Sequence, residues 1–249
     1  KYNMKLSSPD FNVMYKACRK AAKNIIRNFG EIENLQVSLK GPGDFVTASD
    51  KKAEKIIIEE LQNARPDYSI LSEEIGEIKN SDKDNYWILD PIDGTTNFLH
   101  GIPHFAISIA LRVKEEIVSG LIFDPIKDEM FYAEKNNGAY FNNKRIRVSE
   151  KKNINECLFA TGGKDELNKN LNTRKSGSAA LDMAYVGAGR YDGFFQKNLN
   201  IWDIAAGVII LGEAGGKINN INYSTNKVTK VLAGSNSIYE KMLQKLNNF

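Results

Sequence analysis

The sequence predicts a protein in which helices and sheets are packed in layers. Two segments near the N-terminus carry apolar residues at helical spacing, and a run of strand-like segments follows them. The second half alternates strand-like and helix-like segments, which favours mixed α and β layers. The 249 residues contain no internal repeat, low-complexity tract or linker. We therefore expect a single domain, residues 1–249, whose two packed halves span about 5–150 and about 151–249.

The first half is predicted to contain two helices followed by a meander of strands. Ser8 and Pro9 are typical of a helix start, and apolar residues recur at helical spacing from Phe11 to Phe29. A second helix is expected to begin near Ser49 and Asp50, after a Gly-Pro-Gly segment at residues 41–43 that interrupts regular secondary structure. The expected strands are Tyr68–Ser72, Tyr86–Leu89, Phe105–Val113, Ile117–Phe123, Glu129–Glu134, Gly138–Phe141 and Arg145–Val148.

The second half is predicted to alternate between the two kinds of element. Thr161–Thr173 is polar and rich in Asn and Lys, which indicates a mobile loop. The expected strands are Cys157–Ala160, Tyr191–Phe195 and Val231–Ala233, and the expected helices are Ser178–Ala188, Trp202–Leu211 and Ser237–Leu246.

Composition narrows the class of protein. Hydrophobic residues make up 42% and charged residues 26%, and the net charge of +3 is spread over mixed charges. The small net charge gives no electrostatic case for nucleic acid binding, although it does not exclude a local basic patch. Cys18 and Cys157 form no disulfide framework and no CxxC metal site, which fits a reducing, cytoplasmic location. No apolar run reaches about 18 residues, so no membrane span is expected.

The segment from Trp87 to Phe98 carries the strongest functional signal. Asp90 ends a buried strand, and Pro91 and Gly94 force a tight turn through which Asp90 and Asp93 can converge. Two buried, convergent carboxylates repel each other unless a cation lies between them. Hard divalent cations such as Mg²⁺ suit these ligands, and the amides after Gly94 can face an anion. The segment therefore predicts a metal-bound turn that accepts a phosphate.

Two further acidic residues have less specific contexts. Glu73 follows the predicted strand Tyr68–Ser72, and Asp203 opens the helix at Trp202. An acidic pair such as Glu73-Glu74 is typical of a solvated surface, and a helix-opening Asp of an N-cap. Thr95 alone is typical of a turn-capping residue. These residues indicate a functional site only in combination with the Asp90–Asp93 turn.

The combination resembles a known family. Residues 90–96, Asp-Pro-Ile-Asp-Gly-Thr-Thr, look like the signature of the inositol monophosphatase family, which belongs to the Mg²⁺-dependent, Li⁺-sensitive phosphomonoesterases. The resemblance is closest to bacterial inositol-1-monophosphatase-like proteins and covers essentially the whole chain. Three further motifs stand in the family's order: residues 46–50 (Val-Thr-Ala-Ser-Asp), 71–74 (Leu-Ser-Glu-Glu) and 202–207 (Trp-Asp-Ile-Ala-Ala-Gly).

The resemblance implies a fold, a reaction and a set of residues. The implied fold is α+β, a five-layered αβαβα sandwich of the sugar phosphatase type. The first half would bear the metal and catalytic groups, and the second half would line the substrate. Two or three Mg²⁺ ions would be held, the first by Glu73, Asp90 and the carbonyl of Ile92, and the second by Asp90, Asp93 and Asp203. Asp50 and Thr95 would orient a metal-activated water, and a third ion could bind near Glu73.

The resemblance also implies a substrate-binding set. The Gly94 and Thr95 amides would grip the phosphate, with Asp93 beside them. Gln196 stands where the inositol phosphatases usually carry a Glu that contacts substrate hydroxyls, so affinity for inositol itself is open. The remaining implied contacts are Lys40, on a loop near the metals, and Arg174, Ser178 and Ala179, in a segment that lines the pocket.

Several functional alternatives follow. The substrate is expected to be a small phosphorylated polyol, first of all myo-inositol monophosphate. Relatives that accept fructose 1,6-bisphosphate, 3′-phosphoadenosine 5′-phosphate or histidinol phosphate keep those substrates open. The family commonly forms homodimers. Some bacterial members resemble RNA-processing and antitermination factors, so binding to nucleic acid or to the transcription machinery is a second hypothesis.

Overall fold

A computed structural model gives the structure of the protein and describes residues 8–31, 37–41, 44–162, 171–223 and 225–246. For residues 37–41 and 44–47 it describes the backbone alone. The helices are α1 (Pro9–Phe29), α2 (Ala48–Ala64), α3 (Thr95–Leu99), α4 (Ala179–Gly187), α5 (Ile201–Glu213) and α6 (Asn236–Lys245), with a 3₁₀ turn at Ile154–Glu156. The strands are β1 (Val37–Gly41), β2 (Asp44–Thr47), β3 (Tyr68–Ser72), β4 (Gly76–Ile78), β5 (Asp82–Asp93), β6 (Ala106–Val113), β7 (Glu116–Asp124), β8 (Glu129–Glu134), β9 (Gly138–Phe141), β10 (Lys144–Ile146), β11 (Phe159–Ala160), β12 (Thr173–Arg174), β13 (Gly193–Asn200), β14 (Gly216–Ile218) and β15 (Lys227–Ser235).

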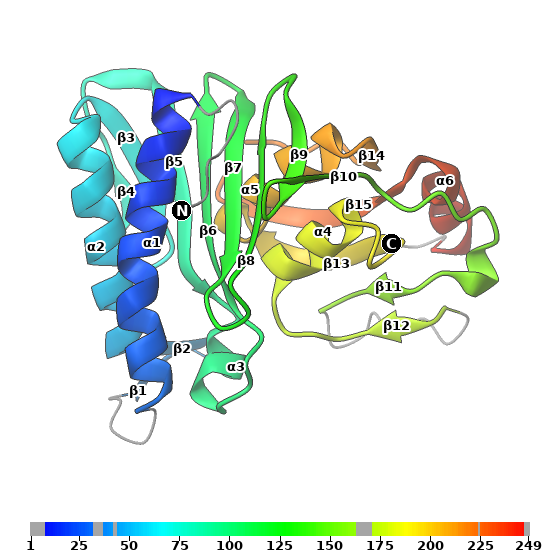
Figure 1. The fold of residues 1–249 in the computed structure, drawn as a ribbon, viewed down its shortest axis with the longest axis horizontal. Coiled ribbons are helices and arrows are strands. Elements are labelled where there is room, and N and C mark those ends of the chain that lie inside the picture. Colours follow the sequence, from blue (N-terminus) through cyan, green and yellow to red (C-terminus); the bar gives the residue numbers. More distant parts are fainter. Residues whose placement is uncertain (1–7, 32–36, 42–43, 163–170, 224, 247–249) are drawn as a thin grey trace.

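Two large sheets alternate with helices to form five layers. One sheet has the strand order β10-β9-β8-β7-β6-β5-β3-β4, and the other has the order β12-β11-β13-β15-β14. Helices α1 and α2 cover one face of the larger sheet, α4 and α5 lie between the sheets, and α6 packs on the outer side of the smaller one (Figure 1). The α+β, five-layered sandwich expected from the sequence is confirmed.

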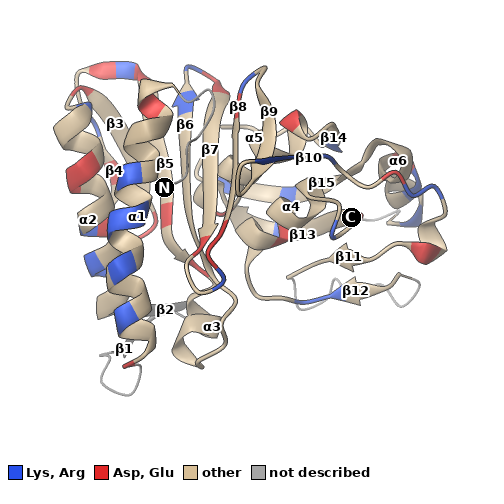
Figure 2. Ribbon diagram, viewed as in Figure 1, with Lys and Arg blue, Asp and Glu red and all other residues tan. Residues whose placement is uncertain are grey.

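The outer helical layer forms because α1 is strongly amphipathic. The hydroxyl of Ser8 accepts a hydrogen bond from the amide of Phe11 at 3.1 Å, and Pro9 occupies the first turn. Phe11, Met14 and Ile25 are among the residues that face the sheet and are fully buried. The opposite side of α1 carries several basic residues (Figure 2). Among them, Lys16 and Lys20 pair with Glu60 of α2 at 2.9 and 2.6 Å.

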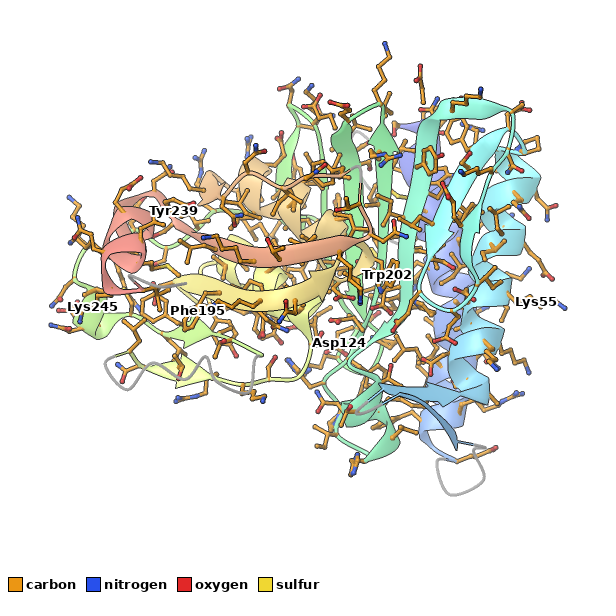
Figure 3. The ribbon with its side chains drawn as sticks, turned by 180° about the vertical axis from the view of Figure 1, so that it is seen from behind. Lys55, Asp124, Phe195, Trp202, Tyr239 and Lys245 are labelled. Atoms are coloured by element: carbon orange, nitrogen blue, oxygen red, sulfur yellow. The ribbon has the colours of Figure 1, made fainter. Side chains whose placement is uncertain are left out.

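Helix α5 packs closely between the sheets because small residues line its contact with β7. A Cβ atom on Gly120 of β7 would lie 2.9 Å from the Cα of Ala206 and 2.6 Å from a methyl group of Ile209. The backbones of β7 and α5 therefore approach as closely as they do only because position 120 has no side chain. Seen from behind in Figure 3, Trp202 marks the junction of the layers, where its carbonyl accepts a hydrogen bond from the hydroxyl of Ser108.

The structure differs from the expected elements in several places, and it also contains α3, β4, β12 and β14, which were not expected. The meander begins only at β5, because β3 pairs parallel to β5 and β4 lies at the sheet edge. The hairpin of β1 and β2 was not expected. The strand expected at Cys157–Ala160 is reduced to β11, since Cys157 caps the preceding 3₁₀ turn, and β13 begins later than expected and extends to Asn200. Residues 163–170 of the expected loop lie outside the described residues.

Candidate active site

Asp90 and Asp93 converge because strand β5 carries one extra residue between them. Side chains alternate along a strand, so residues three apart ordinarily face opposite sides of the sheet. Asp90 pairs with Ser108 and Asp93 with Ala106, so three steps along β5 match two steps along β6. This bulge turns both carboxylates to the same side. Oxygen atoms of Asp90, Asp93 and Asp203 all lie within 4.8 Å of one another.

Glu73 reaches the same place through the parallel pairing of β3 and β5. Ser72 pairs with Leu89, so the residues that follow, Glu73 and Asp90, leave the sheet at the same edge. Carboxyl ends of parallel strands are where binding sites usually form in sheets of this kind. Glu73 lines the same cleft as the three aspartates.

Asp203 comes from the other side of the cleft, in the first turn of α5. Its Oδ2 atom accepts a hydrogen bond from the amide of Asn200 at 2.7 Å, which fixes the side chain against the start of the helix. The positive end of the helix dipole also favours an anion at this position.

The four acidic residues line a cleft of about 320 Å³ between the two sheets. Polar and small residues make up most of its wall. The lining residues are Glu73, Asp90, Ile92, Asp93, Gly94, Thr95, Gly162, Gly177, Ser178, Ala179, Asp182, Gln196, Asn198, Leu199, Asn200 and Asp203. The metal ligands predicted from the sequence thus all line one cleft, and they come from both halves of the chain.

Burial raises the pKa of each aspartate, and repulsion from neighbouring carboxylates adds to the effect at Asp90 and Asp203. Loss of water raises the pKa of Asp90 well above its usual range, and the charges of Glu73, Asp93 and Asp203 add to the effect. Burial raises the pKa of Asp93 to about 6, against the opposing effect of hydrogen bonds from Ser178 and from the backbone of residues 179 and 180. Burial, followed by the charge of Asp93, raises the pKa of Asp203. A cation in the cleft removes the cause of this repulsion.

Ser178 and Ala180 attach the substrate-side helix to Asp93. The Ser178 hydroxyl and the Ala180 amide both donate to Oδ2 of Asp93, the amide at 2.9 Å. Ser178 also caps α4, because its hydroxyl accepts from the amide of Leu181 at 3.3 Å. The start of α4, including Ala179, is therefore held against the acidic cluster.

Asp50 and Thr95 approach the cluster from two different elements. Asp50 is buried in the first turn of α2, and its charge is among the causes that raise the pKa of Asp90. The Thr95 hydroxyl donates to the carbonyl of Ile92 at 3.0 Å. Gly94, which precedes it, has a φ of +102°, and a Cβ atom there would lie 3.2 Å from the carbonyl oxygen of His104. Both its backbone conformation and its surroundings therefore require glycine.

Of three further substrate residues predicted from the sequence, one lines the cleft, one lies outside it, and the side chain of the third is outside the described residues. Gln196 lines the cleft and lies directly over Gly162, where a Cβ atom would come within 2.2 Å of the Gln196 side-chain oxygen. Arg174 is exposed on β12 and does not line the cleft, and its guanidinium donates to the carbonyl of Thr173 at 3.1 Å. Lys40 lies in β1, where side chains fall outside the described residues.

Several polar residues that the sequence did not single out belong to the site or support it. Asn198 and Asn200 line the cleft from β13, and buried Asn97 links two loops beside it. Asp182 accepts from the Ser176 hydroxyl at 2.7 Å and also lines the cleft. The one sequence signal available was a polar residue at an otherwise apolar position, as with Asp182 in the apolar helix α4.

Comparison with known proteins gives consistent likenesses. Residues 7–248 match the model of the inositol monophosphatase family. An inositol-1-monophosphatase of Rhizobium meliloti is 50% identical over 220 residues, which cover 82% of this chain and 83% of the relative. The Nus factor SuhB of Escherichia coli is 37% identical over 96% of both chains. The crystal structure of extragenic suppressor protein suhB from Bartonella henselae superimposes with a TM-score of 0.91 at 45% identity, covering 97% of this chain and 99% of that one.

The five-layered sandwich, its acidic cleft and these likenesses define a phosphatase. Within that class, the chain belongs to the inositol monophosphatase family.

Proposed function

We propose that the protein is a Mg²⁺-dependent phosphomonoesterase that hydrolyses a small phosphorylated polyol, first of all myo-inositol monophosphate. The observation that carries the proposal is the convergence of Asp90, Asp93 and Asp203 within 4.8 Å in a polar cleft. Burial raises the pKa of all three, and repulsion between the carboxylates adds to the effect at Asp90 and Asp203, so a cation in the cleft would be stabilised there. Hard oxygen donors in this number suit Mg²⁺.

The donors divide into two groups. Glu73, Asp90 and the carbonyl of Ile92 would hold one ion, and Asp90, Asp93 and Asp203 would hold a second, so that Asp90 is shared. A third, weaker ion would bind near Glu73. Every one of these residues lines the cleft.

When bound, the cations would neutralise the phosphate charge, polarise the ester and make a bound water more acidic. The chain's own groups would then orient the reactants. Asp50 and Thr95 would align the attacking water and accept its proton, because a carboxylate can orient a hydroxyl that in turn aligns a water molecule. The amides of Gly94 and Thr95 would hold the phosphate oxygens, an arrangement favoured by the left-handed backbone at Gly94.

The substrate side of the proposal rests on the wall of the cleft. A volume of about 320 Å³ suits a small ligand rather than a polymer. Gln196, Asn198 and Asn200 provide uncharged donors and acceptors on β13, which match hydroxyl groups better than a second phosphate. This favours a polyol monophosphate over fructose 1,6-bisphosphate or 3′-phosphoadenosine 5′-phosphate, which carry a second phosphate, and leaves histidinol phosphate to be separated by assay.

A substrate panel tests the proposal directly. Phosphate release is measured by malachite green for inositol monophosphates and the three alternative substrates across a Mg²⁺ titration. We expect the highest kcat/KM with an inositol monophosphate, activity that is lost with a chelator, and inhibition at high Mg²⁺. Equal neglect of every inositol phosphate would remove the substrate assignment. Mg²⁺-independent turnover would remove the mechanism.

A second function, binding to the transcription machinery, is favoured by the likeness to the Nus factor of Escherichia coli. The two functions separate in the variant Asp93→Asn, which removes a ligand charge from the cleft and leaves the outer surface unchanged. Loss of phosphatase activity without loss of complementation in a strain lacking the gene would make binding the main role. Loss of both together would favour catalysis.

Further properties belong to the same proposal. We expect inhibition by Li⁺, which phosphate-release assays measure, and a homodimer, which analytical ultracentrifugation detects. A cytoplasmic location is consistent with two free, buried cysteines. None of the described helices is long and apolar enough to cross a bilayer.

A further inference from the structure

Glu54 is a buried carboxylate beneath the turn that carries Glu73. It lies on α2 and is only 1% exposed. Burial raises its pKa, against the opposing effect of its hydrogen bonds. A carboxylate buried among apolar neighbours such as Ala53, Ile57 and Ile58 costs free energy unless its oxygens find donors.

One oxygen of Glu54 receives three hydrogen bonds, one from the end of β3 and two from the turn that follows it. Its Oε1 atom accepts from the Ser72 hydroxyl, from the amide of Glu74 at 2.9 Å and from the amide of Ile75 at 3.2 Å. The carboxylate therefore fixes the chain on both sides of Glu73.

The turn itself depends on this anchor. Strands β3 and β4 pair through Ser72 and Gly76, which leaves only Glu73, Glu74 and Ile75 to reverse the chain. Gly76 has a φ of +85°, as expected for a three-residue hairpin loop. Two of the three loop residues direct their amides at Glu54, so the direction of the Glu73 side chain follows from the position of this carboxylate.

Helix α2 thus serves the cleft twice. Asp50 and Glu54 are four residues apart and lie on one face of the helix, one turn above the other. Asp50 lies beside the acidic cluster, and Glu54 holds the turn that carries Glu73.

We propose that Glu54 is a positioning residue that sets the affinity of the cation bound by Glu73. The proposal rests on the proposed function, since it presupposes a divalent ion at Glu73. Glu54 itself does not contact the ion. It orients a first ligand through the backbone, and loss of such an outer partner typically costs about 10–100-fold in metal affinity.

Three variants separate position from charge. Glu54→Gln keeps the length and an acceptor oxygen but removes the charge. Glu54→Asp keeps the charge but shortens the side chain by one methylene, so that its oxygen withdraws from the turn. Glu59→Gln, an exposed position on the same helix, is the matched control. Mn²⁺ binding is measured by isothermal titration calorimetry and electron paramagnetic resonance, and unfolding of the metal-free protein is measured in parallel.

We expect Glu54→Asp to weaken at least one Mn²⁺ site by about 10–100-fold, while Glu54→Gln and Glu59→Gln stay within about threefold of the wild type. The weakening should exceed any change at the site of Asp93 and Asp203, which a general loss of stability would affect equally. The reverse pattern, with Asp tolerated and Gln impaired, would show that charge matters rather than position and would overturn the proposal. Unchanged Mn²⁺ binding in both Glu54 variants would also overturn it while leaving the proposed function intact. A wild type that binds no divalent ion would refute both.

Discussion

The side-chain amide of Asn97 connects the metal-bearing turn to the substrate-side loop, and its removal is expected to loosen both. Asn97 lies on α3 and is 8% exposed. Its Nδ2 atom donates to the carbonyl of His104 at 2.7 Å and to the carbonyl of Ser176 at 2.8 Å. A Cβ atom on Gly177 would lie 2.8 Å from the same nitrogen, so the loop packs directly on the amide. Replacing Asn97 by alanine removes both hydrogen bonds and leaves a gap beneath the loop.

The magnitude follows from these contacts. A hydrogen bond contributes about 0.5–1.5 kcal/mol net, and a buried carbonyl left without a donor costs about 1–3 kcal/mol. Water reaches part of the site, so the two effects overlap, and we expect Asn97→Ala to lower the free energy of unfolding by about 2–4 kcal/mol. In a chain of this size, a loss of about 3 kcal/mol lowers Tm by roughly 6–12 °C.

Chemical denaturation and phosphate release measure the two consequences separately. The midpoint of urea unfolding reports stability, with Asn63→Ala as control because Asn63 is exposed on α2. Activity is measured well below the unfolding temperature, where the loosened loop should misplace Ser178, whose hydroxyl donates to Asp93. We expect a lower kcat/KM for Asn97→Ala and no change for Asn63→Ala. Stability within about 0.5 kcal/mol of the wild type would refute this account of Asn97.

Three further outcomes are expected. Gly120→Ala should destabilise the protein by about 1–3 kcal/mol in differential scanning fluorimetry, because its methyl group meets the backbone of α5, whereas Gly212→Ala, with no atom within 4 Å, should not. The pKa of Asp93 is raised to about 6, so the metal-free protein should lose stability as pH rises from about 4 through 6. Because the same carboxyl must lose its proton to bind a cation, Mg²⁺ affinity should fall as pH drops below about 6. Mg²⁺ binding that does not change between pH 5 and 8 would contradict this. Asp203→Asn should reduce kcat/KM about 100-fold or more in the phosphate-release assay, and near-normal activity would exclude Asp203 as a ligand.

The layer order could be predicted from the sequence because each layer has its own periodicity. The helical spacing from Phe11 to Phe29 and the strand-like segments after residue 68 correspond to α1 and the larger sheet. The pairing within the sheets was not predictable, since period-two patterns do not say which strands are neighbours. The parallel contact of β3 with β5 is the example that matters, because it places Glu73 beside Asp90.

The acidic turn was predicted from its residues, but the structural cause of its geometry was not. Pro91 and Gly94 indicated a tight turn, whereas the structure continues β5 through Asp93 and obtains convergence from a bulge. Supporting residues were harder still. Glu54 and Asn97 resemble ordinary polar residues in the sequence, and only their burial and their donors or acceptors reveal a role. Arg174 shows the converse, since a residue implied by resemblance lies exposed outside the cleft.

Different elements contribute the acidic cluster and the uncharged wall of one cleft, and this has a consequence for specificity. The larger sheet and its turns supply Glu73, Asp90 and Asp93, α5 adds Asp203 from the second half, and β13 supplies Gln196. Gln196 lies on β13, which pairs with β15 through backbone groups alone. The pairing of these two strands can therefore stay the same when the side chain at position 196 is changed. Substitutions along β13 can therefore change which hydroxyl groups are recognised without moving the acidic cluster. The reaction and the choice of substrate are thus separable, and Gln196→Glu is the single change that would test this by altering substrate preference at constant Mg²⁺ affinity.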